Sequence, residues 1–426
     1  MASSTATSGA MGPESKELKH DQTNDQSCKP LSGIRVLDLT QIVSGPFCTT
    51  LLANMGAEVV KIEPPGRGDD LRTVGHYAGR EQHEDYFNAN NNSKKSITLN
   101  LKDEVQRQVA HDLVQRADIV VENFAPGTAA RLGMSWDDLR GINSRLLYCS
   151  ISGFGQDGPY RDRTALDPII QAVSGIMSVT GYPETDPVAV GAPLADVVAG
   201  LFAAYTIAAS LHSVKETGRG HYIDISMQAT MLAMLGPRMG GALNAGIAPK
   251  RMGNQNPMRT PCDVYHSRDG TKIFVIVHSD RQWAPFCRAL GRHDWLEVPR
   301  FSSNRLRCEN RDELNGLVFA RFAEFDSDEI TARLAAERIP YAVVNDYVEA
   351  LNDPQVVHRN LVQEVEHKVS GPTRVIGPPW LIDGKRTRVQ PPPTLGEHQD
   401  DVLRDWLGWT RAEVAGLCNG QLGGKP

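Results

Sequence analysis

The sequence predicts an α/β protein with a doubly wound parallel sheet, followed by a smaller α+β unit. Short apolar runs alternate with helix-like segments from residue 31 to about residue 236, and the links between them are short. A Gly-, Asn-, Met- and Pro-rich stretch over 237–257 then precedes a hairpin pattern. With 426 residues, 40% of them hydrophobic and 23% charged, the chain can bury a core in each unit.

The first β-α-β unit begins with an apolar run over 33–40, which predicts a buried strand. A helix is expected over 47–55, with Pro46 in its first turn and Gly56 as its C-terminal stop. A second strand is expected over 57–63, where a Pro-Pro-Gly sequence follows.

The alternation continues along the rest of the first unit. Further strands are expected over 96–101, 117–124, 145–151 and 222–226, with helices over 104–115, across most of 167–214 and from Met227. Ligands of such a sheet bind beyond the carboxyl ends of its strands.

The second unit runs from about 260 to 341. Its pattern predicts a hairpin of strands 263–266 and 272–277, then helices over 280–290 and 327–337. Residues 237–257 are expected to form a linker or loop. Short strands separated by prolines should follow Pro340, with a last helix over 400–407.

Composition excludes several classes of protein. The 45 Lys and Arg against 51 Asp and Glu give a net charge of −6, which disfavours general nucleic-acid binding. The longest apolar stretch, 197–211, is short for a membrane span. Seven scattered cysteines without a C-x-x-C pair are typical of reduced thiols and offer no zinc site of that kind. We therefore expect a cytoplasmic protein with no metal and with no nucleic-acid or membrane partner.

The N-terminal 30 residues are rich in Ser, Thr, Ala, Gly and charge, and we interpret them as a disordered tail. They contain no apolar segment of the kind found in secretory signals and no arginine, which a mitochondrial presequence would have.

Three loops follow predicted strands and carry candidate ligand-binding groups. The junction 38–46 lacks both G-x-G-x-x-G and the P-loop motif, so it is either an ordinary turn or a helix N-terminus open to phosphate. Asn91–Lys95 and Asn123–Gly127, with Arg131 after them, could pair with an anionic ligand or could be solvated surface.

Two aspartates lie in apolar, helix-like surroundings. Asp196 follows a proline and precedes a small-residue helix, so it is either a helix N-cap or a carboxylate nucleophile. Asp167 lies in a similar setting. The Gly-rich loop 152–159 is not G-x-S-x-G, so it does not support a serine hydrolase.

These segments, in this order, resemble the class III CoA-transferases, the family of formyl-CoA:oxalate and carnitine CoA-transferases, whose fold α-methylacyl-CoA racemases share. The similarity runs from about Lys29 to Leu417 and rests on segments 31–40, 44–47, 56–63, 66–70, 94–102, 121–127, 152–159, 195–200 and 217–227.

The resemblance implies an interlocked homodimer with a Rossmann-like, CoA-binding large domain built from 31–236 and 341–426 and a small domain over 237–340. It also places the catalytic aspartate at Asp196. In the family's mechanism this carboxylate attacks a donor acyl-CoA thioester, forming a mixed anhydride and then an aspartyl-CoA thioester. CoA thioesters and carboxylic acids are the substrates, and no cofactor is bound permanently.

The residues expected to contact CoA or substrate, carried over from the family's motifs, are Ile42, Val43, Arg67, Asn91, Lys94, Asn123, Phe124, Ala125, Arg131 and Asp167. One departure is Pro64, which occupies the position of a family arginine, so Arg67 is the expected replacement.

The overall pattern is closest to the branch that uses succinyl-CoA with small dicarboxylic acids. Racemase relatives use a histidine directly before the Asp167 position, where this chain has Leu166. Without that proton carrier, two-base racemisation is disfavoured. An acyl-CoA racemase or isomerase, and a non-catalytic CoA-binding protein of the same fold, remain the alternatives.

Overall fold

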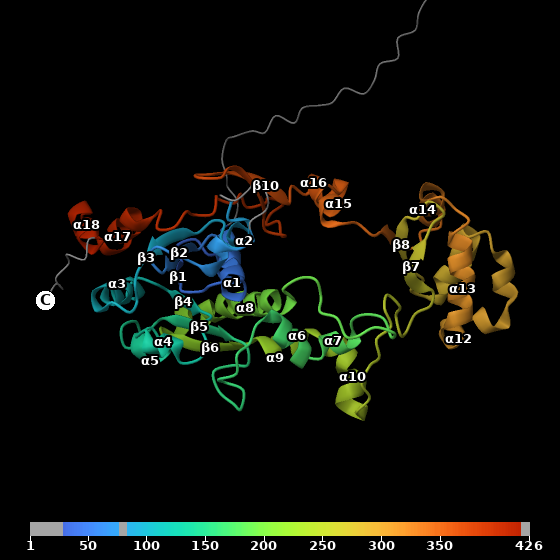
Figure 1. The fold of residues 1–426 in the computed structure, drawn as a ribbon, viewed down its shortest axis with the longest axis horizontal. Coiled ribbons are helices and arrows are strands. Elements are labelled where there is room, and N and C mark those ends of the chain that lie inside the picture. Colours follow the sequence, from blue (N-terminus) through green and yellow to red (C-terminus); the bar gives the residue numbers. More distant parts are fainter. Residues whose placement is uncertain (1–28, 76–82, 419–426) are drawn as a thin grey trace, which may run out of the picture.

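A computed structural model describes residues 29–75 and 83–418 and has an α/β architecture (Figure 1). The predicted tail lies almost wholly outside these ranges. Six parallel strands form the main sheet, in the order β3-β2-β1-β4-β5-β6. They are β1 Arg35–Asp38, β2 Glu58–Glu63, β3 Lys95–Thr98, β4 Ile119–Glu122, β5 Leu147–Ser152 and β6 His221–Ser226. The predicted parallel sheet is confirmed, and its strand order reverses between β1 and β4.

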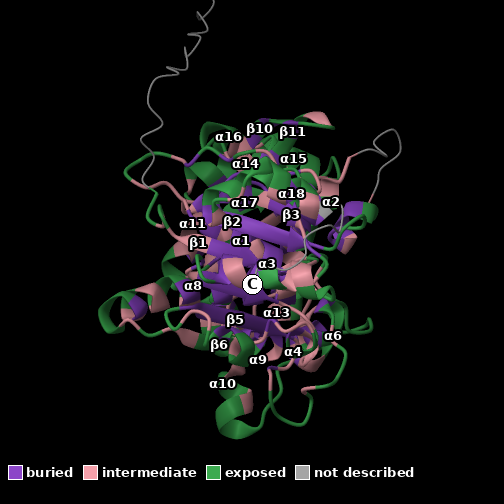
Figure 2. Ribbon diagram, turned by 90° about the vertical axis from the view of Figure 1, so that its left-hand side faces the viewer, coloured by how far each residue is buried: buried purple, intermediate pink, exposed green. Residues whose placement is uncertain are grey.

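Helices cover both faces of this sheet, so its central strands are largely buried (Figure 2). One hydrophobic core lies between the sheet and the helices α1 Ser44–Asn54, α6 Asp167–Val173, α7 Ile176–Val179, α8 Leu194–Thr217 and α9 Met227–Met234. The other core includes side chains of α3 Glu104–Val114, α5 Trp136–Leu139, α17 Gln399–Leu407 and α18 Arg411–Cys418. Short helices η1 Asp70–Thr73, α2 Asp85–Ala89 and α4 Thr128–Arg131 complete this part.

Helix α8 is longer than the apolar stretch recognised in the sequence. Among the described residues it alone is long and apolar enough, by length and composition, to cross a membrane. Here, however, it packs against α1, β5, β6 and α9, as the core helix of an α/β protein does. Its apolar composition therefore has a structural explanation within the fold.

The second unit has its own core at the end of the molecule farthest from α17 and α18 (Figure 1). Strands β7 Cys262–His266, β8 Lys272–Ile276 and β9 Tyr341–Val343 form an antiparallel sheet. Around it lie η2 Asp280–Gln282, α11 Trp283–Ala289, η3 His293–Glu297, η4 Pro299–Phe301, α12 Asn304–Glu309, α13 Arg311–Phe322 and α14 Ser327–Ala336. The predicted hairpin is confirmed.

Several predicted elements differ from the structure. Helix α10 Gly236–Ala245 forms in the segment expected as a linker, with a proline in its first turn and Gly246 in the left-handed conformation as its C-cap. Helices α12 and α13 were not predicted. Beyond Pro340 the chain forms helices α15 Tyr347–Leu351 and α16 Pro354–His358 before the hairpin of β10 Val362–His367 and β11 Gly371–Ile376. Helix α1 begins at Ser44, before the expected residue.

Candidate functional site

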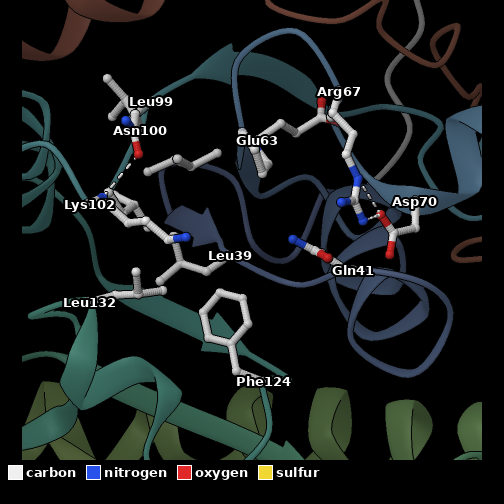
Figure 3. A pocket seen from close by; sticks show the side chains of 14 residues that line it. Leu39, Gln41, Glu63, Arg67, Asp70, Leu99, Asn100, Lys102, Phe124 and Leu132 are labelled. Atoms are coloured by element: carbon white, nitrogen blue, oxygen red, sulfur yellow. Dashed lines mark hydrogen bonds and ion pairs between the residues drawn. The ribbon is translucent and has the colours of Figure 1, made fainter.

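Two adjoining pockets open at the carboxyl ends of the strands, where the strand order reverses, and both are lined by Phe124. The first, of about 340 Å³, is lined by residues that follow β1, β2 and β3, including Gln41, Arg67, Leu99 and Lys102 (Figure 3). The second, of about 280 Å³, lies between the ends of β1, β4 and β5 and the start of α8. This is where an α/β sheet binds its ligand.

Asp196 lies in the first turn of α8 and lines the second pocket. Burial and the nearby Asp167 carboxylate raise its pKa to about 6, although a hydrogen bond from Ser44 opposes this shift. A carboxylate of this kind is ionised at neutral pH but less strongly solvated than a surface aspartate. It can therefore act as a nucleophile toward an electrophilic carbonyl.

Asp167 holds the N-terminus of α8 rather than pointing freely into the pocket. Its Oδ2 accepts hydrogen bonds from the backbone N–H groups of Ala195 (2.7 Å) and Asp196 (3.2 Å). Its Oδ1 accepts from Nε2 of Gln171 at 2.6 Å. A buried anion at these otherwise unpaired N–H groups stabilises the helix start. Asp167 thus fixes the position of the Asp196 backbone.

The turn between β1 and α1 brings Ile42 and Ser44 to the same pocket. Ile42 has a φ of 69°, a left-handed conformation that a β-branched residue rarely adopts. Asp69 accepts a hydrogen bond from the backbone N–H of Ile42 and so holds this residue in place. The side chain of Asn123 forms two hydrogen bonds with the backbone of the preceding residue, Gln41. Backbone strain of this kind is concentrated at ligand sites.

A buried charge cluster lies behind this turn. The ammonium of Lys94 pairs with Asp38 at 3.0 Å and also donates to the carbonyl of Pro46 and to Oδ1 of Asn91. Lys61 pairs with Asp69 at 3.0 Å and donates to the backbone of the same turn. The structure therefore places the side chains of Lys94 and Asn91 inside the protein, whereas the motif resemblance implied that they contact CoA. Neither residue lines either of the two pockets described above.

The other predicted contacts lie at or near the pocket mouths. Arg67 lines the first pocket and is paired with Asp70; Lys102 reaches into the same space from the opposite side (Figure 3). Ala125 lines the second pocket together with Phe124. Arg131 donates to the hydroxyl of Thr128 on the exposed helix α4. Val43 is the N-cap residue of α1 and lines neither pocket.

A loop between β5 and α6 closes one side of the second pocket and carries two arginines that sequence reasoning missed. Arg161 donates to the carbonyl of Gln156 and pairs with Asp162, both at 3.0 Å. Arg163 lies over the rings of Phe154 and Tyr160, 5.5 and 5.2 Å from their centroids. The pocket therefore combines the carboxylate of Asp196 with the cations of two arginines, which can pair with an anionic ligand. In the described ranges no His, Cys, Asp and Glu side chains gather into a metal-binding group.

Comparison with known proteins identifies the family. The family model of CoA-transferase family III matches residues 31–399. The chain belongs to CoA-transferase family III. The resemblance inferred from its motifs is confirmed, and the protein is an enzyme that transfers CoA between acyl-CoA thioesters and carboxylic acids.

Two relatives and one solved structure illustrate the similarity. The transferase is 34% identical over 406 residues to a succinyl-CoA:glutarate CoA-transferase of Mus musculus, covering 94% of this chain and 92% of that protein. It is 39% identical over 357 residues to an acetyl-CoA:oxalate CoA-transferase of Acetobacter aceti, covering 83% and 90%. A crystal structure of a CAIB/BAIF family protein from Brucella suis superposes with a TM-score of 0.79 at 31% identity, covering 89% and 100%.

Proposed function

We propose that the transferase moves CoA from succinyl-CoA to a small carboxylic or dicarboxylic acid, with Asp196 as the covalent nucleophile. The observation that carries this proposal is the position of Asp196. It lies in the first turn of α8 and lines the second pocket together with the β1–α1 turn and two arginines. Burial keeps this carboxylate weakly solvated, which favours attack on a thioester.

The proposed reaction consists of four acyl-transfer steps. One Asp196 oxygen attacks the donor carbonyl, forms a mixed anhydride and expels CoA thiolate. The thiolate attacks the Asp196 carbonyl, so that an aspartyl-CoA thioester forms and the donor acid leaves as its carboxylate. The acceptor carboxylate attacks this thioester, regenerating thiolate and a second anhydride. The thiolate then attacks the acceptor carbonyl, which releases acceptor-CoA and free Asp196.

The first pocket is the proposed site of the nucleotide part of CoA, with Arg67 and Lys102 as its phosphate partners. The proposed path of the pantetheine arm toward Asp196 runs along the β1–α1 turn and the end of β4. It is bordered by Ile42, Phe124 and Ala125, which line the second pocket, and by Val43, the neighbour of Ile42. Arg131 is proposed to approach the phosphates from α4. Asn91, Lys94, Asn123 and Asp167 are proposed to act mainly by holding the β1–α1 turn and α8 in place. CoA thioesters are substrates, and no permanent cofactor is proposed.

A dicarboxylic acceptor fits the charge of the second pocket. One carboxylate of such an acid must approach Asp196, so the second needs a cation at some distance from it. Arg161 and Arg163 line the same pocket and can supply that cation. Both relatives described above have a dicarboxylate, glutarate or oxalate, in their names.

Leu166 counts against the racemase alternative. It is 64% exposed and lines the second pocket, so a residue at this position would face a substrate bound there. Because leucine has no titratable group, it cannot exchange a proton at the α-carbon of an acyl-CoA.

The test is one assay in D₂O. Purified protein is mixed with succinyl-CoA, a branched 2-methylacyl-CoA and a panel of mono- and dicarboxylic acids, and the thioesters are analysed by mass spectrometry. We expect new acyl-CoA species from dicarboxylic acids and no deuterium at the α-carbon. Deuterium without new thioesters would instead establish a racemase, and binding without either change would establish a CoA-binding protein.

We also propose that two copies form an interlocked homodimer, with the large domain built from 31–236 and 341–426 and the small domain from 237–340. Two separate connections join the units (Figure 1), and α8 carries exposed apolar side chains, among them Leu201 at 54% and Tyr205 at 71% exposure. These side chains border an apolar pocket of about 350 Å³. Contiguous exposed apolar side chains of this kind support a protein interface.

The dimer proposal predicts a sedimentation mass twice the chain mass of 46.7 kDa. Tyr205→Glu should reduce that mass, because it introduces a charge into the apolar face. A wild-type mass of one chain at micromolar concentration would contradict the proposal.

We place the enzyme in the cytoplasm, since the cysteines Cys48, Cys149, Cys262, Cys287 and Cys308 are all free thiols.

A further inference from the structure

Two neighbouring residues of the β1–α1 turn line different pockets. Gln41 lines the first pocket (Figure 3), whereas Ile42 lines the second. The left-handed backbone at Ile42, with its φ of 69°, costs a β-branched residue free energy and persists only where neighbouring contacts hold it. The turn therefore borders both pockets, and its shape depends on the groups that bind its backbone.

Asp69 binds this turn from the side of the first pocket. Its neighbours Gly68 and Asp70 line that pocket, whereas Asp69 itself is fully buried and lines neither pocket. Its Oδ1 accepts hydrogen bonds from the backbone N–H of Ile42 at 3.2 Å and from that of Leu71 at 3.0 Å. One carboxylate oxygen thus joins the loop after β2, residues 64–70, to a residue of the second pocket.

The remaining contacts of Asp69 fix it to the same two segments. Its backbone N–H donates to Oε2 of Glu63 at 3.0 Å, and Arg72 holds Glu63 by hydrogen bonds of 2.7 and 2.8 Å. Its Oδ2 pairs with Lys61 at 3.0 Å, and the ammonium of Lys61 also donates to the carbonyl of Thr40 at 2.6 Å. Both side chains of this ion pair are fully buried, so water does not compete for them. A displacement of the loop therefore displaces the contact with the turn.

We propose that Asp69 is a positioning residue that makes CoA transfer depend on the nucleotide part of the thioester. This inference rests on the proposed function, in which the first pocket binds the nucleotide and Asp196 is the nucleophile. A nucleotide bound at Arg67 orders the loop 64–70, and Asp69 passes this order to Ile42, beside the path of the pantetheine arm. Binding energy from the remote part of the substrate then aligns the thioester with Asp196, so that it raises kcat and does not only lower KM.

The test compares two donors with glutarate as acceptor. Succinyl-pantetheine has the same thioester and the same arm as succinyl-CoA but no nucleotide. For the wild type we expect kcat to be about tenfold higher or more with succinyl-CoA, because only this donor orders the loop. Arg67→Ala should raise KM for succinyl-CoA and leave KM for succinyl-pantetheine unchanged, since only succinyl-CoA carries the phosphates.

Two variants without a buried charge isolate the contact with Ile42. Lys61→Met/Asp69→Leu replaces the ion pair by apolar side chains, which buried pairs often tolerate, and removes the acceptor. Lys61→Met/Asp69→Asn is the matched control, because an asparagine Oδ1 can still accept from the same N–H. In the leucine variant kcat should fall about tenfold with succinyl-CoA and much less with succinyl-pantetheine, so that the ratio of the two approaches one. The asparagine variant should keep the wild-type ratio.

A second measurement uses the wild-type enzyme and needs no variant to fold. Adenosine 3′,5′-bisphosphate, a fragment of the missing nucleotide, is added to the reaction with succinyl-pantetheine. We expect it to raise kcat, because it occupies the first pocket and orders the loop without being joined to the arm. No increase at a saturating concentration would overturn the inference.

An equal loss with both donors in the leucine variant would show that Asp69 serves only the structure, and an unchanged ratio would show that its contact with Ile42 is idle. Failure of the proposed function gives different results. If Asp196→Asn keeps its activity, the proposed nucleophile is wrong. If Arg67→Ala leaves KM for succinyl-CoA unchanged, the proposed nucleotide site is wrong. If both behave as expected and the ratio does not fall in the leucine variant, only the role of Asp69 is wrong.

Discussion

Replacing the proposed nucleophile by its amide, in Asp196→Asn, should abolish CoA transfer while CoA binding changes little. Asparagine keeps the shape of the side chain, and the backbone N–H of residue 196 still donates to Asp167. The amide is not a nucleophile toward a thioester, so neither the anhydride nor the aspartyl-CoA thioester can form. Losing a group that forms the covalent intermediate costs on the order of 10⁴-fold or more in kcat.

The measurement pairs acyl-CoA product analysis with calorimetric titration of CoA. Asp186→Asn provides the matched control, because Asp186 is an exposed carboxylate in the segment that leads to α8. That variant should retain wild-type transfer. An equal loss of transfer and of CoA binding in Asp196→Asn would show that Asp196 serves the structure rather than the chemistry.

Lys94→Met should destabilise the fold strongly, whereas Lys95→Met should not. The two lysines are neighbours in sequence, but their side chains face different environments. Lys94 is fully buried against Asp38, and methionine would leave that carboxylate with less compensation. Removing one partner of a buried ion pair costs about 3–5 kcal/mol. Lys95 pairs with Glu58 on the surface, with a third of its side chain exposed, and such pairs contribute about 0–1 kcal/mol.

The free energy of unfolding, from urea denaturation of the two variants, checks this difference.

Asp38 also determines how the cluster responds to acid. Its pKa is lowered to about 2 by Lys94, Lys61 and two threonine hydroxyls, against the effect of burial. The stabilisation it provides is therefore present above its ordinary pKa of 3.8 and is lost as the pH falls toward about 2. Equal stability of Lys94→Met and Lys95→Met would contradict the structural role assigned to the cluster.

The main sheet could be predicted because its strands are apolar and its turns are marked by proline and glycine. Helix α10 could not, because three of its ten residues are glycines, which have poor helix propensity. The missed helices α12 and α13 have weak amphipathic patterns, and their burial depends on a core formed with distant strands.

The position of Asp196 at the second pocket agrees with the motif that singled it out, whereas the contacts of its neighbours could not be predicted. Lys94 lies in a motif that pointed to ligand binding, but in the structure its ammonium pairs with Asp38. Asp38 precedes it by 56 residues, so this contact could not be predicted from the motif. The bond between Asp167 and the start of α8 likewise joins residues 28 and 29 positions apart.

The most direct test of the central claim is to trap CoA on the enzyme. The transferase is mixed with succinyl-CoA, quenched in acid and digested, and the peptide containing Asp196 is analysed by mass spectrometry. We expect this peptide to carry the mass of CoA less one water, as an aspartyl thioester does, and the adduct to disappear when an acceptor acid is added. The same peptide from Asp196→Asn should remain unmodified. An active enzyme whose Asp196 peptide never carries CoA, or that carries it at another residue, would contradict the mechanism proposed for this site.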